Sequence, residues 1–460
     1  MINLSAELAS FAGTLSDERL RALERIIPLE LVQEVLEQTG HARRHCDTLP
    51  PCFVVWLVIG LGLFATDSYV DIFKRLQRFR PGATPHRNTI GAARQGLGCA
   101  VMRLLEQRVV RLLGQADTPD CFYKDLRLMA VDSFKLDLFD SPANARVFGY
   151  PKGRKGKGAF PQARVLALCE TGTHVIYRHL IKPGQRGEIG MTPTLLRHLE
   201  AGMLVMWDRN LFSYKALKEV RNCNAHLLCR LKKNVLKKNK LGVVIEVLSD
   251  GSYLAKAYAS EKDRRHDKDG IKVRVIEYTL EDPGRPIKKE ERVHRLMTTL
   301  LDEEEYPAEE LIVLYHERWE EELTIDEIKT HQRQREVLRS QTPAGVVQEI
   351  EGLLLGHYAV RAVMAEAAAA AGVGPRQISF VGTLKVLRNR LPEAKPGKAK
   401  RKKWWQNLVA EVSELVLPPR RNRVNPRVMR RPGGFWPKKR EHHKQHPQPA
   451  MPFRDSIRLC

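Results

Sequence analysis

The chain has 460 residues, of which 43% are hydrophobic, enough for two or three domains with apolar cores. It carries 77 Lys and Arg against 54 Asp and Glu, a net charge of +23, so we expect it to bind a polyanion, with nucleic acid the default candidate. The 8 cysteines form no CxxC pair, which argues against a zinc ribbon, and the lack of a signal peptide fits a reducing cytosol. The most apolar run, residues 53–65, is too short to span a bilayer and is predicted to be a buried helix.

Residues 1–115 are predicted to be helical. Apolar residues recur at helical spacing from Pro28, which suits the first turn of a helix, and again over 68–76 and 91–113. Basic residues accompany these helices, at Arg43, Arg44 and over 74–87. The pattern fits a helical DNA-binding module, of which a helix-turn-helix is one form, although any small helical domain would look similar.

Residues 116–345 are predicted to form a mixed sheet with helices. The expected order is three strands, a helix, a strand, a helix and a strand, over 126–132, 163–168, 174–181, 192–200, 203–208, 213–221 and 225–231, with Thr192 as a helix cap. This order is typical of an α/β fold of the ribonuclease-H-like type. A β-rich piece over about 233–303, with strands over 241–248, 252–259, 271–280 and 292–300, is predicted to be an insertion in that core.

The remainder divides into helices over 346–394, led by a long helix over 342–371, and a basic, Pro-rich, partly disordered tail over 395–460. Residues 404–416 should form a short helix within the tail. Trp404 and Trp405 could stack on bases, but an anchoring role is the preferred interpretation. The group His442, His443 and His446 is a weak metal signal, and a solvated tail explains it better.

Residues 311–329 are predicted to form one helix. Tyr315, Arg318, Glu322 and Lys329 then fall within an arc of roughly 60°. A phenol, a guanidinium, a carboxylate and an ammonium on one stripe suit a metal beside a phosphate. A solvated face with ion pairs is the alternative interpretation.

Three carboxylates are candidates for a metal site. Asp132 and Asp208 each end a predicted strand, and these strands lie side by side in the expected sheet, where a packed helix could bring Glu322 to them. Carboxylate oxygens suit Mg²⁺ or Mn²⁺, and two such ions can drive phosphoryl transfer on a nucleic acid backbone.

Each carboxylate also has a plainer explanation or a rival. An Asp after a strand is often only a turn former. Asp137 and Asp140 compete with Asp132, although both are expected beyond the strand, and Asp326 shares the stripe of Glu322. Glu320 and Glu321 should lie on other faces of the helix.

The motif Tyr315-x2-Arg318-x3-Glu322-x6-Lys329 resembles the Y-x2-R-x3-E-x6-K signature of the insertion sequence 4 family of DDE transposases. The segment 130–133 (AVDS) looks like the first aspartate motif of that family, and 208–212 (DRNLF) like its second, D-R-x-x-F, with Asn210 where the family usually has Gly. The segments 140–144 (DSPAN) and 161–164 (PQAR) are also similar. The resemblance covers about residues 15–345 and extends loosely to 423–427.

This resemblance implies a DNA transposase that excises and reinserts its own element. Asp132, Asp208 and Glu322 would hold the catalytic metals, Mg²⁺ or Mn²⁺ and two ions in number. The residues that would contact DNA phosphates are Tyr315, Arg318, Lys329 and Arg209.

The implied partners are the terminal inverted repeats of the element and target DNA, both double-stranded, bound by a homodimer that bridges two ends. The implied location is the bacterial cytoplasm, at the nucleoid when DNA is bound. An inactive DNA-binding relic and a metal nuclease without strand transfer are the alternatives. Hairpin formation would require an aromatic residue to receive a flipped base. Trp207 and Trp319 are near the site in sequence, but either could belong to the core, and neither is assigned this role.

Overall fold

The computed structural model describes residues 22–41, 49–76, 84–153, 156–231, 244–282, 293–394, 397–418 and 450–460. Its contacts divide the chain into two units, Met1–His198 with Glu320–Leu417, and Leu199–Trp319 with Pro418–Cys460. We describe each unit by itself. The predictions for residues 1–21, Arg43, Arg44, 78–80, 232–240, 423–427 and the three tail histidines lie outside the described residues.

The first unit contains a three-stranded antiparallel sheet at its centre. β5 (Gln162–Glu170) pairs with both β2 (Leu126–Leu138) and β6 (Val175–Pro183). β1 (Phe122–Tyr123) pairs antiparallel with one end of β2, and β13 (Val337–Leu338) pairs parallel with the other. A separate small ribbon joins β3 (Lys152–Gly153) to β4 (Gly156–Lys157). The three predicted strands of this half are therefore confirmed.

Two helices accompany this sheet. α7 (Pro142–Phe148) begins at Ser141, whose hydroxyl accepts from the Asn144 amide. α8 (Glu188–Leu196) begins earlier than predicted, at Gly187 as N-cap. Thr192 is not a cap: it lies inside α8, and its hydroxyl donates to the Glu188 carbonyl over 3.0 Å.

The N-terminal helices are α2 (Leu29–Gln38), α3 (Pro51–Leu63), α4 (Tyr69–Leu76), α5 (Arg87–Leu97) and α6 (Ala100–Val109). The predicted helix over 91–113 is two helices, because Gly98 has a φ of 68° and ends α5. α3 is buried along its whole length, as its apolar run predicts, since every residue from Cys52 to Leu63 is covered.

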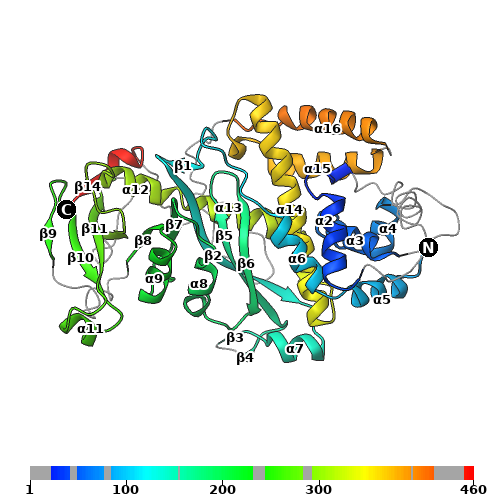
Figure 1. Ribbon diagram of the computed structural model, residues 1–460, viewed down its shortest axis with the longest axis horizontal. Helices are drawn as coiled ribbons and strands as arrows, with labels where there is room; N and C mark the ends of the chain where they lie inside the picture. Colours follow the sequence, from blue (N-terminus) through cyan, green and yellow to red (C-terminus); the bar gives the residue numbers. More distant parts are fainter. Residues whose placement is uncertain are drawn as a thin grey trace, which may run out of the picture. The chain divides into compact units, whose positions relative to one another are not determined.

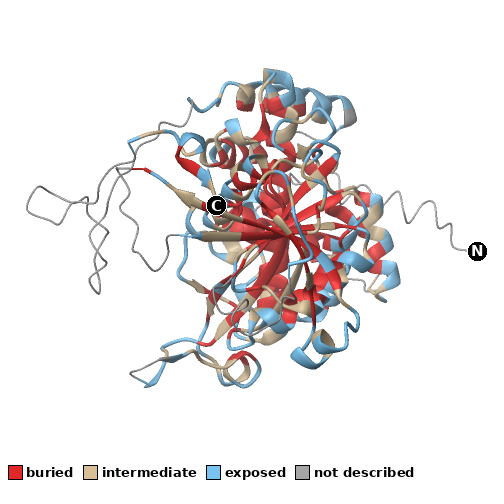
Figure 2. Ribbon diagram, turned by 90° about the vertical axis from the view of Figure 1, so that its left-hand side faces the viewer, coloured by how far each residue is buried: buried red, intermediate tan, exposed pale blue. Residues whose placement is uncertain are grey.

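The C-terminal helices of the unit are α14 (Pro343–Ala371), α15 (Phe380–Arg390) and α16 (Lys398–Ser413). α14 begins at the N-cap Thr342 and is the long helix beside α3, α6, α15 and α16 (Figure 1). Trp405 is buried and donates from Nε1 to Glu366 over 2.9 Å, so the anchoring role predicted for this pair is confirmed. Buried residues concentrate in strands and on inner helix faces, and exposed residues lie on the outer turns (Figure 2).

α3 and α14 cross with their backbones in close approach. A Cβ on Gly62 would overlap the Gly352 carbonyl, and a Cβ on Gly352 would overlap the Val58 carbonyl. One continuous apolar core therefore includes α2 to α6 and much of α14, α15 and α16.

The described residues of the second unit include six paired strands and three helices. β7 (Met203–Trp207) and β8 (His226–Arg230) are parallel, and antiparallel neighbours continue through β12 (His294–Thr298), β11 (Ile271–Leu280), β10 (Tyr253–Ala257) and β9 (Glu246–Val247). Its helices are α9 (Tyr214–Asn222), α11 (Glu261–Arg265) and α12 (Ala308–His316). The chain therefore combines parallel and antiparallel strands with helices, as the predicted mixed α/β class requires.

The last residues of the chain were predicted to be loose, but Ile457–Leu459 form β14, which pairs with β11. Within the part of the chain that the structure describes, no helix has the length and apolar character needed to cross a membrane.

Candidate active site

One cavity of the first unit holds three of the predicted site residues. Asp132 from β2, Glu322 from α13 (Trp319–Asp326) and Lys329 from the π-helix η3 (Glu327–Gln332) line it, and its volume is about 560 Å³. Residues far apart in the sequence thus meet in one place. Two carboxylates and an ammonium in one cavity can bind divalent cations next to phosphate oxygens.

Asp132 lies in the middle of β2, so the prediction that it ends a strand is wrong, and Asp137 also lies within this strand. The strand continues because Phe134 and Leu136 keep the two-residue period of an extended strand. That period places Asp132 on the same face of β2 as these buried side chains, which pack in one cluster with Ile328 of η3. The sheet face and the helix that carries Glu322 meet for this reason.

The segment predicted as one helix over 311–329 is three pieces. α12 ends at a turn over Glu317 and Arg318, α13 follows, and η3 completes the segment. In the turn, the Arg318 amide donates to the Tyr315 carbonyl over 3.2 Å, an i to i−3 bond in place of the α-helical i−4 bond. The regular angular step stops there, so the four residues do not lie on one continuous α-helix, contrary to the prediction.

This break separates the four signature residues into two groups. Glu322 and Lys329 belong to the first unit, with Asp132. Tyr315 and Arg318 belong to the second unit, with Asp208, which follows the end of β7.

In the second unit, Tyr315 is hydrogen-bonded to the last residue of β7. Its hydroxyl donates to the Trp207 carbonyl over 3.3 Å, and the Arg318 guanidinium lies 5.9 Å from the centre of its ring. Burial raises the pKa of Tyr315, the charge of Asp208 raises it further, and Arg318 opposes both, so the phenol stays protonated. The Asp208 carboxylate accepts from Asn210 Nδ2 over 2.9 Å.

The remaining predicted residues differ in exposure. Arg209 is exposed in the turn after β7. Trp207 is completely buried and belongs to the core, whereas Trp319 is 55% exposed.

The rival carboxylates have other partners. Asp137 accepts from Gln162 over 2.7 Å, and Asp140 accepts from the Tyr150 hydroxyl over 2.5 Å. Asp326 accepts from Thr330 at the surface, and Glu320 is buried against His174. None of these four rivals is among the described residues that line the cavity of Asp132. Glu321 is also buried and does not line it.

Among the cavity residues without a role assigned from the sequence, three polar ones contact one another. Arg164 of β5 donates from Nη1 to the Ser133 hydroxyl over 2.7 Å, and that hydroxyl donates to Glu188 over 2.6 Å. Arg164 also forms an ion pair with Glu188. Ser133 lies in the segment 130–133 and Arg164 in the segment 161–164, and the similarity of both segments to family motifs could have pointed to these two residues. Nothing in the sequence around Glu188 distinguished it.

A buried charge cluster surrounds Glu327 of η3, the element that also carries Lys329. Glu327 of η3 contacts His174 and His357 over 3.0 Å each, and it pairs with Arg361 of α14. Burial raises the pKa of Glu327, but Arg361 and His174 outweigh burial and hold it well below its usual range. The ionised Glu327 thus fixes η3 to α14, five residues after Glu322.

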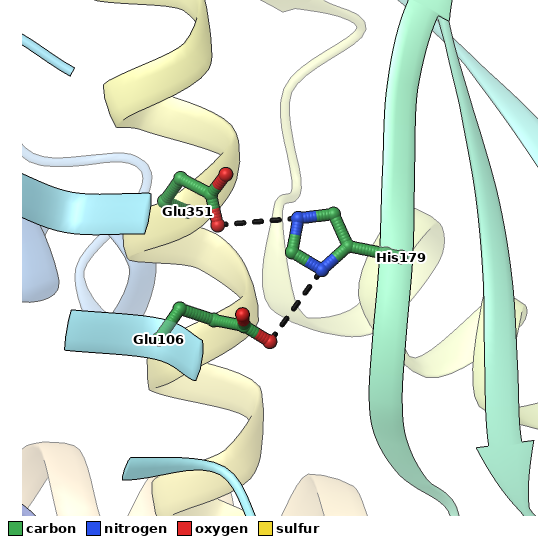
Figure 3. A group of neighbouring side chains, drawn as sticks. All are labelled: Glu106, His179 and Glu351. Atoms are coloured by element: carbon green, nitrogen blue, oxygen red, sulfur yellow. Dashed lines mark ion pairs between the residues drawn. The ribbon is translucent and has the colours of Figure 1, made fainter. Parts of the chain in front are cut away.

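A second cluster has the residue types of a metal site. His179 of β6 lies between Glu106 of α6 and Glu351 of α14 (Figure 3), with Nδ1 3.5 Å from Glu106 and Nε2 3.2 Å from Glu351. Burial lowers the pKa of His179, but the two carboxylates outweigh burial and raise it to about 10. Both ring nitrogens face carboxylates, which favour the protonated ring. The imidazolium therefore balances the charge of the two carboxylates, as a metal ion would in a site of these residue types.

Comparisons with known proteins show the family to which the chain belongs. Residues 17–106 match the family described as insertion element 4 transposase N-terminal, and residues 123–358 match the transposase DDE domain. The second match covers just over half of the chain, so this protein belongs to the DDE transposases, enzymes of metal-dependent DNA phosphoryl transfer.

Within that class the chain is of the insertion sequence 4 type. It is 27% identical over 421 residues to transposase InsG for insertion sequence element IS4 of Escherichia coli, covering 89% of this chain and 92% of InsG. It is 23% identical over 216 residues to the putative transposase InsZ of the same organism, covering 45% of this chain and 71% of InsZ. The predicted family, DNA transposase function and enzyme class are thereby confirmed.

A solved structure of the piggyBac transposase synaptic complex with hairpin DNA aligns over 86% of this chain and 80% of that one, at 11% identity. Its TM-score is 0.38.

Proposed function

We propose that Asp132, Asp208 and Glu322 are the catalytic carboxylates of this transposase. The observation that carries the proposal is the cavity shared by Asp132 and Glu322, with Lys329 in its wall. Asp208 is included because it stands in the second aspartate motif and lies close enough to Tyr315 to influence its pKa.

The donor set fits a divalent cation. Carboxylate oxygens are hard ligands, which Mg²⁺ and Mn²⁺ prefer, and both ions bind nucleic acid phosphates directly. We infer that Asp132, Asp208 and Glu322 hold two such ions. When bound, the ions would activate the attacking oxygen and stabilise the leaving oxygen of an in-line displacement.

The basic residues position the DNA in this proposal. Lys329 offers a point charge to a phosphate, and Arg164 offers a planar guanidinium that Ser133 and Glu188 already hold in one orientation. Tyr315, Arg318 and Arg209 form a second group of phosphate contacts, in the second unit.

The proposed reaction is cut-and-paste transposition. The terminal inverted repeats of the element are cleaved, and the freed 3′-hydroxyl attacks target DNA, with a homodimer joining the two ends. The proposed fold of residues 116–345 is ribonuclease-H-like, with the insertion over 233–303, after the helical domain 1–115 and before the helices 346–394 and the tail 395–460. The proposed site of action is the bacterial cytoplasm.

The test is a strand-transfer assay with purified protein, Mg²⁺ and DNA carrying the element ends. Asp132→Asn, Asp208→Asn and Glu322→Gln should each lower cleavage about 10²–10³-fold or more, the scale of losing one preorganised electrostatic group, while end binding persists. Matched controls are Asp137→Asn on the same strand as Asp132 and Asp326→Asn on the same helix as Glu322, and both should cleave at the wild-type rate.

The product pattern decides between the proposal and its alternatives. Joined products support a transposase, cut products alone indicate a nuclease, and a mobility shift without chemistry indicates a relic. Full activity in any of the three variants would remove that carboxylate from the site.

A further inference from the structure

A second cavity of the first unit lies between the N-terminal helices α4 and α5 and the segment that leads into α14. Its volume is about 700 Å³. Four arginines line it, Arg87, Arg94, Arg335 and Arg339, and no Asp or Glu is among the described residues that do. Such a cavity attracts anions, because the nearby cationic groups are not balanced within its lining.

Two helix N-termini add to this positive charge. α5 begins at Arg87, and α14, which is 29 residues long, begins after Thr342, and both residues line the cavity. The N-terminal end of a helix carries unsatisfied amide groups and a partial positive charge, and it is a common binding place for phosphate.

Arg94 provides an independent observation, since it is a buried cation in the cavity wall. The residue is 5% exposed, and it donates to the Tyr69 hydroxyl over 2.6 Å and to the Ser340 hydroxyl over 3.3 Å. Its Nε is buried and has no hydrogen-bond partner among the described residues. These neighbours are neutral, so they orient the guanidinium without cancelling its charge.

The other arginines differ in how they are held. Arg339 donates to the Asp67 carbonyl over 2.6 Å, and its Nε lies 3.7 Å from Glu349, which neutralises part of its charge. Arg335 donates to the Thr66 carbonyl over 2.7 Å. Contacts between helices account for Arg94 and Arg339, but Arg87 and Arg335 are exposed and do not contribute to the core.

We propose that this cavity binds backbone phosphates of duplex DNA, at a place separate from the catalytic cavity. The inference rests on the proposed function, and it adds a contact surface that joins the N-terminal helices to the start of α14. Duplex DNA fits better than a small anion because two of the four cavity arginines, Arg87 and Arg335, are exposed, where successive phosphates can reach them. Contacts to phosphates carry no sequence information, so this surface would hold DNA of any sequence.

The test compares two double variants with the same loss of charge. Arg87→Gln with Arg335→Gln removes the two exposed cavity arginines. Arg25→Gln with Arg108→Gln is the control, because these arginines lie outside the cavity and already pair with Glu366 and Glu34, at 2.9 and 3.3 Å. Binding of a fluorescent duplex is measured by anisotropy between 50 and 300 mM KCl, about the range where phosphate contacts dominate.

The cavity variant should lose about two units of slope in log K against log salt, because each phosphate contact contributes about 0.9. Its Kd at the lowest salt should rise about tenfold or more, and the control should keep the wild-type slope. Arg87→Lys with Arg335→Lys should restore most of the slope, because it restores the charge. Wild-type melting temperatures would show that each variant folds.

Three results would overturn the inference. The first is a wild-type slope in the cavity variant, and the second is an equal loss in the control. The third is thermal stabilisation by 10 mM inorganic phosphate that vanishes in the cavity variant while its DNA slope stays unchanged, which would indicate a small-anion site. A wild type that neither binds nor cuts DNA would instead refute the proposed function as well.

Discussion

The ion bridge of His179 allows a quantitative prediction about stability. The imidazole side chain is 6% exposed and lies between Glu106 and Glu351, and Arg103, Arg178, Lys182 and His198 line the same small cavity. His179→Gln removes the positive charge that lies between the two buried carboxylates, and Glu351 keeps only the half-exposed Arg103, whose Nε lies 3.9 Å away, as an ion-pair partner among the described residues. Removing one member of a buried ion pair costs about 3–5 kcal/mol of unfolding free energy.

The pH dependence follows from the pKa, which is about 10 in the folded protein against a model value of 6.5. Because the folded value is the higher one, the stabilisation is complete below pH 6.5 and is lost as the pH rises towards 10. Between these two pH values the folded state binds one more proton than the unfolded state, so the unfolding free energy falls by about 1.4 kcal/mol per pH unit. Between pH 7 and pH 9 the loss is about 2.5 kcal/mol.

Urea unfolding followed by tryptophan fluorescence at these two pH values measures the effect. Buried groups such as Cys121, whose pKa burial raises to about 12, also weaken the fold at high pH. The test is therefore the difference in slope between the wild type and His179→Gln. His331→Gln, at an exposed histidine, is the control and should behave as the wild type. An equal pH slope in His179→Gln and the wild type would refute the assignment of a protonated His179.

Two further predictions concern packing. Glu327→Gln leaves the buried Arg361 guanidinium without its carboxylate and should cost about 3–5 kcal/mol in urea unfolding; a loss below 1 kcal/mol would show that the cluster does not hold η3. Gly62→Ala should lower stability by about 1–3 kcal/mol or more, because its Cβ would overlap the Gly352 carbonyl, whereas Gly91→Ala, which meets nothing within 4 Å, should stabilise α5 by about 0.5–1 kcal/mol. Equal melting temperatures for the two glycine variants would contradict the close approach of α3 and α14.

The sequence predicted the strands and buried helices well because their patterns depend on local apolar spacing. The mostly apolar run over 126–132 lies in β2, and most of the apolar run over 53–65 lies in α3. The extension of β2 beyond Asp132 was missed because a carboxylate after an apolar run looks like the end of a strand. The strand β14 was missed because three residues in a basic tail give no periodic signal, and its stability comes from pairing with β11.

The site was predicted in part. The spacing of Glu322 and Lys329 and the position of Asp132 pointed to residues that share a cavity. The turn over Glu317 and Arg318 could not be predicted, because neither Gly nor Pro stands there to mark it. Glu188 reaches the cavity only through tertiary packing of α8, which leaves no trace in local sequence.

The crossing of α3 and α14 limits how this transposase can be re-engineered. Grafting the N-terminal helices of a relative onto this chain would bring a foreign α3 against the native α14. With backbones this close, a side chain larger than hydrogen at Gly62 or Gly352 would overlap a backbone carbonyl of the facing helix and weaken the docking. A successful chimera must therefore exchange the N-terminal helices and α14 as one piece, although the sequence separates them by the whole catalytic region.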